Sequence, residues 1–326
     1  MSSRRDVLAL AALGLAGACA GPRRQQRAPV HVPDDPTPAA APPAGSEIVV
    51  CGERHDIHTP VVLWSDPGGY DATSTALAFP SAPPSEPIEG LRYAPGRTRS
   101  DGGASCGPDA THAELARVVD QFVLHYDACG SSRRCFQVLH DRRKLSVHFM
   151  LDLDGTLYQT LDLVHTCWHA RQANPRSIGV EIAHPGAFAP GSDEFARWYE
   201  RDAQGMRQVV PETAGATGLR TPGFVARPAR PDPVRGVVQG QDLVQYDFTE
   251  AQYRALWFLT LGLTRVFPRL PLAVPHDADG RVRQRVLRDD EFARFRGLLG
   301  HHHVSDAKTD PGPAFDWSRL PGLVAS

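Results

Sequence analysis

Short apolar runs bounded by polar or turn-forming residues occur through the middle of the chain. Runs of this length predict buried β-strands. We expect four of them, at residues 121–126, 146–152, 156–160 and 177–183. Asp152-Leu153-Asp154-Gly155 predicts a hairpin turn between the second and the third strand. A further apolar run, Val61 to Trp64, is followed by a turn at residues 66–69.

Helix signals lie between and after these strands. Thr111-His112-Ala113-Glu114 has the pattern of a capping box, and apolar residues follow it. Residues 135–145 have a helical pattern. Thr249 begins a predicted amphipathic helix that runs to about Val266.

One long segment, from Phe188 to Asp247, is rich in proline, glycine and arginine. Loops of this length without regular structure are uncommon in compact domains, and they are either functional lids or disordered. The sequence favours neither of these two alternatives over the other.

Length and charge limit the class of protein. The chain has 326 residues, of which 41% are hydrophobic and 22% are charged, enough for one large domain or two small ones. A formal net charge of -2 gives no overall basic field, so nucleic acid is not an expected partner. After the first twenty residues, no run approaches the ~18 apolar residues that a transmembrane helix needs.

Residues 1–20 have the pattern of an export signal. Arg4-Arg5 precedes an Ala/Leu/Gly-rich run, and small residues surround Cys19. The arginine pair is similar to a twin-arginine signal, and Ala16-Gly17-Ala18-Cys19 is similar to a lipoprotein processing site. Ala18-Cys19-Ala20 also fits an ordinary cleavage site before Gly21. We therefore expect an exported, periplasmic protein, and we favour a lipoprotein, anchored to the outer membrane through a lipidated Cys19, over a soluble secreted form. Residues 21–46 are rich in proline, alanine and arginine, which predicts a tether.

Five cysteines follow Cys19. In an oxidising compartment, Cys129 and Cys135 are close enough in sequence to form a local disulfide. Because five is an odd number, at least one cysteine stays unpaired or reduced within a monomer.

The C-terminal region holds the first candidate chemistry. The chain has only two lysines, and one of them, Lys308, lies between the histidine triplet at residues 301–303 and Asp310. Histidine nitrogen and carboxylate oxygen together suit Zn²⁺. A neighbouring ammonium group is what a hydrolytic zinc site needs to stabilise an oxyanion. The alternative is a polar surface loop with a chance run of histidines.

Two upstream segments add to this pattern. His125 ends a hydrophobic strand, and Trp168-His169 and Asn174 precede the apolar strand that contains Glu181. A lone histidine on a strand is more often a hydrogen-bonded structural residue. A glutamate in an apolar strand is different, because burying a charge is costly unless the charge is paired or functional.

The order of these motifs resembles the zinc-dependent N-acetylmuramoyl-L-alanine amidases, the type 2 amidase family related to peptidoglycan recognition proteins. The resemblance runs from about Gln121 to Trp317, interrupted by an insertion at about 189–246. It is carried by Leu124-His125-Tyr126, Ser146-Val147-His148-Phe149, Asp154-Gly155-Thr156-Leu157-Tyr158-Gln159, Trp168-His169-Ala170, Ser177-Ile178-Gly179-Val180-Glu181 and Lys308-Thr309-Asp310-Pro311-Gly312-Pro313.

The resemblance implies an α/β fold, with a mixed central β-sheet flanked by helices in a single amidase domain at residues 111–326. Residues 47–110 would be an N-terminal extension. The resemblance also implies that His125, His301 and Asp310 bind Zn²⁺, with His302 and His303 as rivals of His301. It implies the disulfide between Cys129 and Cys135 as well.

In the same way, the resemblance implies that Glu181 is the general base and Lys308 the transition-state lysine. Some relatives use a tyrosine where this chain has Val147, a departure that favours Glu181. Trp168, His169 and Asn174 resemble residues of the substrate cleft, although wall packing and strand-end hydrogen bonds would explain them equally well.

The implied activity is hydrolysis of the amide bond between N-acetylmuramic acid and L-alanine in peptidoglycan or muropeptides. The alternative is a non-catalytic peptidoglycan-binding module, which loss of a ligand or of the base would indicate. A zinc protease is a third reading, but the chain lacks the His-Glu-x-x-His pattern of one large protease class.

Overall fold

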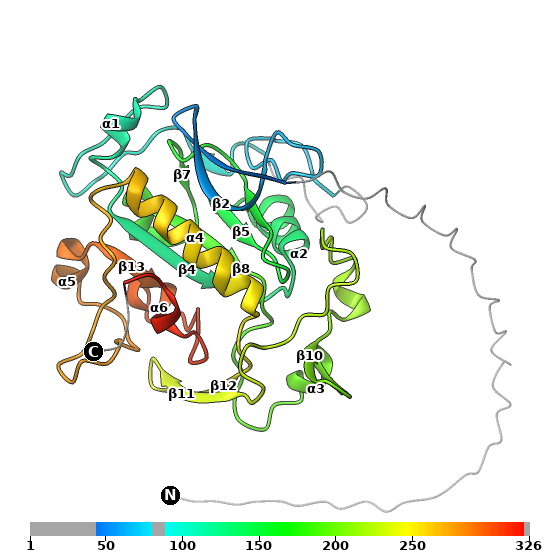
Figure 1. Ribbon diagram of the computed structural model, residues 1–326. Helices are drawn as coiled ribbons and strands as arrows, with labels where there is room; N and C mark the ends of the chain where they lie inside the picture. Colours follow the sequence, from blue (N-terminus) through cyan, green and yellow to red (C-terminus); the bar gives the residue numbers. More distant parts are fainter. Residues whose placement is uncertain (1–43, 80–88, 323–326) are drawn as a thin grey trace, which may run out of the picture. The chain divides into compact units, whose positions relative to one another are not determined.

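A mixed seven-stranded sheet forms the centre of the structure, a computed structural model that describes residues 44–79 and 89–322. The strand order is β1-β2-β6-β5-β8-β4-β13 (Figure 1). The strands are β1 (Gly45–Val50), β2 (Glu53–Leu63), β4 (Gln121–Tyr126), β5 (Phe149–Leu151), β6 (Leu157–Gln159), β8 (Ser177–Ile182) and β13 (Gly297–Gly300). β5, β8, β4 and β13 are parallel neighbours, whereas β1 with β2 and β5 with β6 are antiparallel pairs.

Helices and short hairpins surround this sheet. The helices are α1 (His112–Leu115), α2 (Ser132–Phe136), α3 (Glu194–Trp198), α4 (Glu250–Val266), α5 (Asp289–Arg294) and α6 (His301–Val304). A π-helix, Gln137–Arg143, continues α2, and short 3₁₀ turns cover Arg171–Arg176, Glu212–Ala214 and Trp317–Arg319. The remaining strands form the pairs β3 (Tyr93–Ala94) with β7 (Thr166–Cys167), β9 (Tyr199–Asp202) with β10 (Gly205–Gln208), and β11 (Val234–Val238) with β12 (Gln241–Gln245).

The long helix α4 covers the sheet and forms much of the core. Thr249 caps it as predicted, through a capping box with Gln252. Its apolar face, which includes Leu256, Leu259 and Leu263, is buried in the largest hydrophobic cluster. At Gly262 the helix approaches β2 so closely that a Cβ atom would lie 2.3 Å from the Cγ2 atom of Ile57. A glycine is needed for this approach.

The predicted α/β fold with a mixed central sheet flanked by helices is confirmed. The strand at residues 121–126 has the predicted bounds, and the strand at 177–183 ends one residue earlier, at Ile182. The two hairpin strands are shorter than predicted. The predicted helix at residues 135–145 is instead the end of α2 followed by the π-helix.

The segments outside the predicted core strands also have regular structure. Within residues 47–110, β1 and β2 are part of the central sheet itself. The insertion at about 189–246 contains α3 and two β-hairpins, so it is not a structureless loop. The predicted export signal at 1–20, with Cys19, and most of the tether lie outside the described residues. Within the described ranges, none of the helices combines the length and the apolar character of a membrane span.

Candidate active site

Three parallel strands bring the candidate residues to one edge of the sheet. In the pairing of β4 with β8, His125 lies directly opposite Glu181. On the other side of β4, Gly300 at the end of β13 lies opposite Leu124. The next residue, His301, therefore emerges beside His125. Residues 176 positions apart in the sequence meet because their strands run in the same direction.

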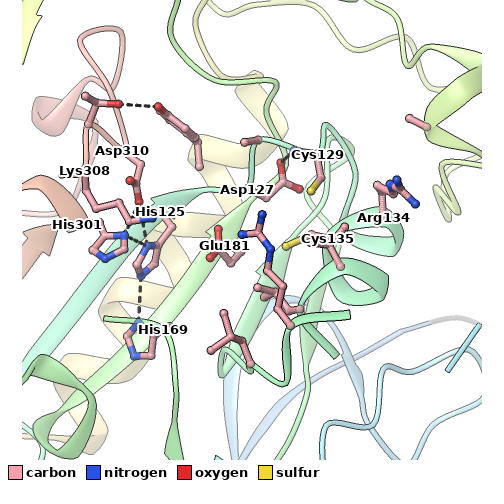
Figure 2. Close-up of a pocket in the computed structure, with 18 of the residues that line it drawn as sticks. His125, Asp127, Cys129, Arg134, Cys135, His169, Glu181, His301, Lys308 and Asp310 are labelled. Carbon is pink, nitrogen blue, oxygen red and sulfur yellow. Dashed lines mark hydrogen bonds and ion pairs between the residues drawn. The ribbon is translucent and has the colours of Figure 1, made fainter. Parts of the chain in front are cut away.

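His125, His301 and Asp310 form a buried cluster. The Nδ1 atom of His125 lies 3.0 Å from Nδ1 of His301 and 2.9 Å from Oδ2 of Asp310. Nδ1 of His301 lies 3.1 Å from the same carboxylate oxygen. The three side chains point toward one another at the wall of a cleft (Figure 2). All three residues are buried, with exposed fractions of 2%, 7% and 6%.

The geometry of this cluster fits a zinc ion. Two imidazoles and a carboxylate are a ligand set of hydrolytic zinc sites. In a tetrahedral site with bonds of about 2.0 Å, neighbouring ligand atoms lie about 3.3 Å apart. The observed separations of 2.9 to 3.1 Å are close to that value. The residues present therefore fit the predicted metal.

The other two histidines of the triplet point elsewhere. His302 contacts the backbone oxygen of Asp310 through Nδ1, at 3.0 Å. His303 accepts a hydrogen bond from the backbone N–H of Gly300 and donates one to the carbonyl of Arg283, at 2.6 Å. Among the three, His301 is the one whose ring nitrogen reaches His125 and Asp310.

Burial keeps the cluster in the protonation states that bind a metal. Burial, followed by the neighbouring His301, lowers the pKa of His125 to about 4. Burial acts to raise the pKa of Asp310, but the two histidines outweigh it and hold that pKa below its usual value. At neutral pH, His125 is therefore neutral and Asp310 is ionised, as metal ligands need to be.

A second layer of hydrogen bonds orients His125. Its Nε2 atom lies 3.0 Å from Nδ1 of His169, and Nε2 of His169 lies 3.3 Å from Oγ of Ser177. When Nδ1 of His125 binds a cation, Nε2 carries the ring proton and donates a hydrogen bond to Nδ1 of His169. Such outer partners fix the tautomer of a metal-ligating histidine. His169 thus contacts His125 and also lies on the cleft wall.

The side chain of Asn174 holds the loop that carries His169. Its oxygen accepts hydrogen bonds from the backbone N–H groups of His169 and Ala170, at 3.1 and 2.6 Å. Asn174 is not among the residues that line the cleft, whereas Trp168 and His169 are. Two of the three predicted substrate-binding residues therefore line the cleft, and the third supports the loop behind it.

Glu181 and Lys308 line the same cleft as the histidine-aspartate cluster. The carboxyl group of Glu181 has a pKa well above its usual value, because burial and then the charge of Asp310 both raise it. The ammonium group of Lys308 acts in the opposite direction. A cation bound beside Asp310 would also lower this pKa. The environment thus favours the protonated form of this carboxyl group more than an exposed glutamate would, which is the direction expected for a group that accepts a proton from water.

Residues far away in the sequence hold the loop that carries Lys308 and Asp310. The hydroxyl groups of Tyr126 and Thr309 lie 2.7 Å apart. Gln245, the last residue of β12, donates to the carbonyl of Pro311 at 3.0 Å and accepts from the N–H of Ala314 at 2.9 Å. No pattern in the sequence pointed to Gln245, because its contacts depend on how the insertion folds back onto this loop.

The insertion also forms part of the cleft. Arg197 and Trp198 of α3, together with Thr213 and Ala214, line a cavity of about 640 Å³ with the site residues. Arg134 and Arg143, from the segment that follows β4, line it as well. Several cationic side chains thus line the same cavity as Glu181.

The predicted disulfide between Cys129 and Cys135 is not formed in the structure. All five cysteines of the described residues are free thiols. Cys129 and Cys135 contact each other, and this hydrogen bond, followed by burial, raises the pKa of the Cys135 thiol well above its usual value. Both thiols line the cleft on the side of Glu181.

Comparison with known proteins identifies the class. The family model described as N-acetylmuramoyl-L-alanine amidase matches residues 115–313, which is more than half of the chain. The chain therefore belongs to this family, the type 2 amidases, as the sequence motifs predicted. The comparison with curated proteins finds no match.

Several solved structures are similar to this chain. A selenomethionine derivative of AmpD shares 17% identity with a TM-score of 0.33, covering 78% of this chain and 98% of that one. AmiD from E. coli, in complex with the substrate anhydro-N-acetylmuramic acid-L-Ala-D-gamma-Glu-L-Lys, shares 15% identity with a TM-score of 0.36, covering 70% and 65%. The Ph2119 endolysin of a Thermus scotoductus bacteriophage shares 15% identity with a TM-score of 0.32, covering 64% and 86%.

Proposed function

We propose that the protein is a zinc hydrolase that cleaves the amide bond between N-acetylmuramic acid and L-alanine in peptidoglycan or muropeptides. The observation that carries this proposal is the convergence of His125, His301 and Asp310 in a cleft that also contains Glu181 and Lys308. Membership of the amidase family gives the class of bond. The cationic lining of the cleft suits a substrate that carries carboxylates.

In this proposal His125, His301 and Asp310 hold Zn²⁺, which supplies Lewis acidity toward a carbonyl group and lowers the pKa of water. Glu181 takes a proton from the attacking water. It then passes this proton to the nitrogen of L-alanine as the amide bond breaks. The ammonium group of Lys308 stabilises the negative charge that develops on the oxygen of the lactyl carbonyl. His169 keeps the imidazole of His125 in the tautomer that presents Nδ1.

We also propose that the substrate is reached outside the cytoplasm. The support is the N-terminal sequence, in which a twin-arginine-like signal precedes Cys19 and a proline-rich tether. Fractionation of cells that express the full chain tests this proposal, with Cys19→Ser as the matched variant. Export with membrane association that depends on Cys19 is expected. A wild-type protein retained in the cytoplasm would contradict it.

The activity itself is tested with purified muropeptides. Metal-free protein is expected to release no stem peptide, and addition of Zn²⁺ is expected to restore release. His125→Ala should remain inactive at the same zinc concentration. If the zinc-loaded wild type binds muropeptides but releases no peptide, the protein is the non-catalytic binding module that the sequence left as the alternative.

A further inference from the structure

A second group of metal-ligating side chains lies outside the active-site cleft. Glu53 and His55 belong to the start of β2, and His112 is the first residue of α1. Each offers a ligand atom, and these atoms lie within 4.8 Å of one another. We propose that Glu53, His55 and His112 bind a divalent transition-metal ion of the zinc class. This ion would join the N-terminal hairpin β1–β2 to helix α1, which ends where the residues matched by the family model begin.

The position of Glu53 and His55 follows from strand geometry. Residues two apart on a β-strand project to the same side, so the carboxylate and the imidazole share one face of β2. The Nε2 atom of His55 lies 3.9 Å from Oε2 of Glu53. This separation is too long for a hydrogen bond and is about 0.6 Å longer than the roughly 3.3 Å between neighbouring ligands of a tetrahedral site. The exposed side chain of Glu53 would therefore move toward His55 on binding an ion.

His55 has an unsatisfied nitrogen that an ion would satisfy. Its Nε2 atom is shielded from solvent and has no hydrogen-bond partner within the described part of the chain. Buried polar atoms of this kind are rare, and each one needs an explanation. The ring of His55 packs edge-on against the ring of His112, with centroids 5.3 Å apart. The two imidazoles are therefore already held together.

The hydrogen bond of His112 leaves it suited to bind a metal. Its Nε2 atom lies 2.8 Å from the carbonyl oxygen of Val266, at the end of α4. A carbonyl oxygen only accepts, so Nε2 carries the proton and Nδ1 keeps its lone pair. A ring N–H donated to a backbone carbonyl is the usual outer partner of a metal-ligating histidine. A second ring contact, to Phe267, holds the imidazole at a centroid distance of 6.2 Å.

This cluster is separate from the active site. In the sheet, β6, β5 and β8 lie between β2 and β4, which carries His125. Four steps of about 4.8 Å place the two strands on the order of 19 Å apart. None of the three residues lines the active-site cleft. An ion here would have a structural effect, because it would link β2, α1 and, through Val266, the end of α4.

The test uses the untagged full chain with the active-site ligands removed. The variant His125→Ala/His301→Ala is expected to keep one zinc per chain, bound by Glu53, His55 and His112, whereas the wild type is expected to hold two. Adding His55→Ala and His112→Ala should remove the remaining zinc. Adding His58→Ala instead, an exposed histidine on the same strand that pairs with Asp56, should not. The number of zinc ions per chain is measured in each variant after gel filtration.

Thermal unfolding gives an independent measurement. At free zinc about 100-fold above the dissociation constant, the unfolding midpoint of His125→Ala/His301→Ala should rise by about 5 °C. The rise should disappear in the variant that also lacks His55 and His112. If that variant fails to fold, Glu53→Gln in the same background should weaken zinc binding at least tenfold. Absence of zinc in His125→Ala/His301→Ala, with no shift of its midpoint, would overturn the proposal.

A failure here is distinguishable from a failure of the proposed activity. His55→Ala/His112→Ala in the otherwise wild-type chain is expected to release stem peptide at the wild-type rate while it holds one zinc instead of two. A chain that hydrolyses muropeptides with one zinc per wild-type molecule would keep the proposed function and reject the second site.

Discussion

The substitution Glu181→Gln separates a catalytic carboxylate from a structural one. Glutamine has nearly the same shape and can accept hydrogen bonds, but it cannot take a proton from water. General acid–base catalysis contributes about 10²- to 10⁴-fold to a rate. We therefore expect kcat to fall by that factor, which corresponds to about 3 to 5 kcal/mol of activation free energy.

The same substitution should not weaken the fold. Burial, followed by the charge of Asp310, raises the pKa of Glu181 in the folded protein. A raised pKa means that the folded state binds the proton more tightly than the unfolded state. Stability from this group is therefore present at low pH and is lost as the pH rises above the unfolded value of about 4.3. In metal-free protein at pH 8, Glu181→Gln should be at least as stable as the wild type.

Three measurements on one preparation of each variant decide whether Glu181 is catalytic or structural. Chromatography of released stem peptide gives the rate, elemental analysis gives the zinc content, and thermal unfolding gives the stability. Glu200→Gln, on β9 of the insertion, is the matched control and should keep the wild-type rate, because Glu200 is exposed and is not among the residues that line the cleft. Full zinc content with a rate within tenfold of the wild type would remove Glu181 from proton transfer. Loss of zinc would instead make it a structural residue.

Other substitutions test neighbouring parts of the account. His301→Ala should lower zinc affinity by at least about 100-fold. His303→Ala should keep zinc and lose about 1–3 kcal/mol of stability, because it removes the hydrogen bonds of His303 to the Gly300 N–H and the Arg283 carbonyl; metal titration and denaturant unfolding compare the two variants, and equal zinc affinities would refute the assignment. Lys308→Met should reduce kcat by about 10²-fold with zinc retained, since it removes an oxyanion-stabilising charge; an unchanged kcat would exclude that role. Burial raises the pKa of Asp152 to about 8, so the stability that this carboxyl group contributes at low pH is lost from about pH 4 to pH 8, at up to about 1.4 kcal/mol per pH unit. Asp152→Asn should remove this contribution from the slope of stability against pH measured by denaturant unfolding, and an unaltered slope would contradict this.

The parts of the fold that local sequence determines were predictable. The apolar run at residues 121–126 and the capped, amphipathic helix beginning at Thr249 have the predicted bounds or nearly so. Strand β13 was not predicted, because Gly297-Leu298-Leu299-Gly300 is short and half glycine. It becomes a strand only through its pairing with β4. The joining of β1 and β2 to the sheet likewise depends on long-range pairing.

The site shows the same division between local and long-range information. Family motifs pointed to His125 and Asp310, but spacing alone left His301, His302 and His303 as rivals. Strand β13 decides among them, because it delivers His301 directly beside His125. The hydrogen bond between His125 and His169, and the support of the Asp310 loop by Gln245, depend on contacts between distant segments. No local sequence pattern predicts such contacts.

The most direct test of the central claim is a crystal structure of the zinc-loaded chain with diffraction measured at the zinc absorption edge. An anomalous peak bonded to Nδ1 of His125, Nδ1 of His301 and the carboxylate of Asp310, facing the cleft beside Glu181, is the predicted result. If protein from the same preparation is fully active but its crystals show no anomalous peak at these three atoms, the account is contradicted.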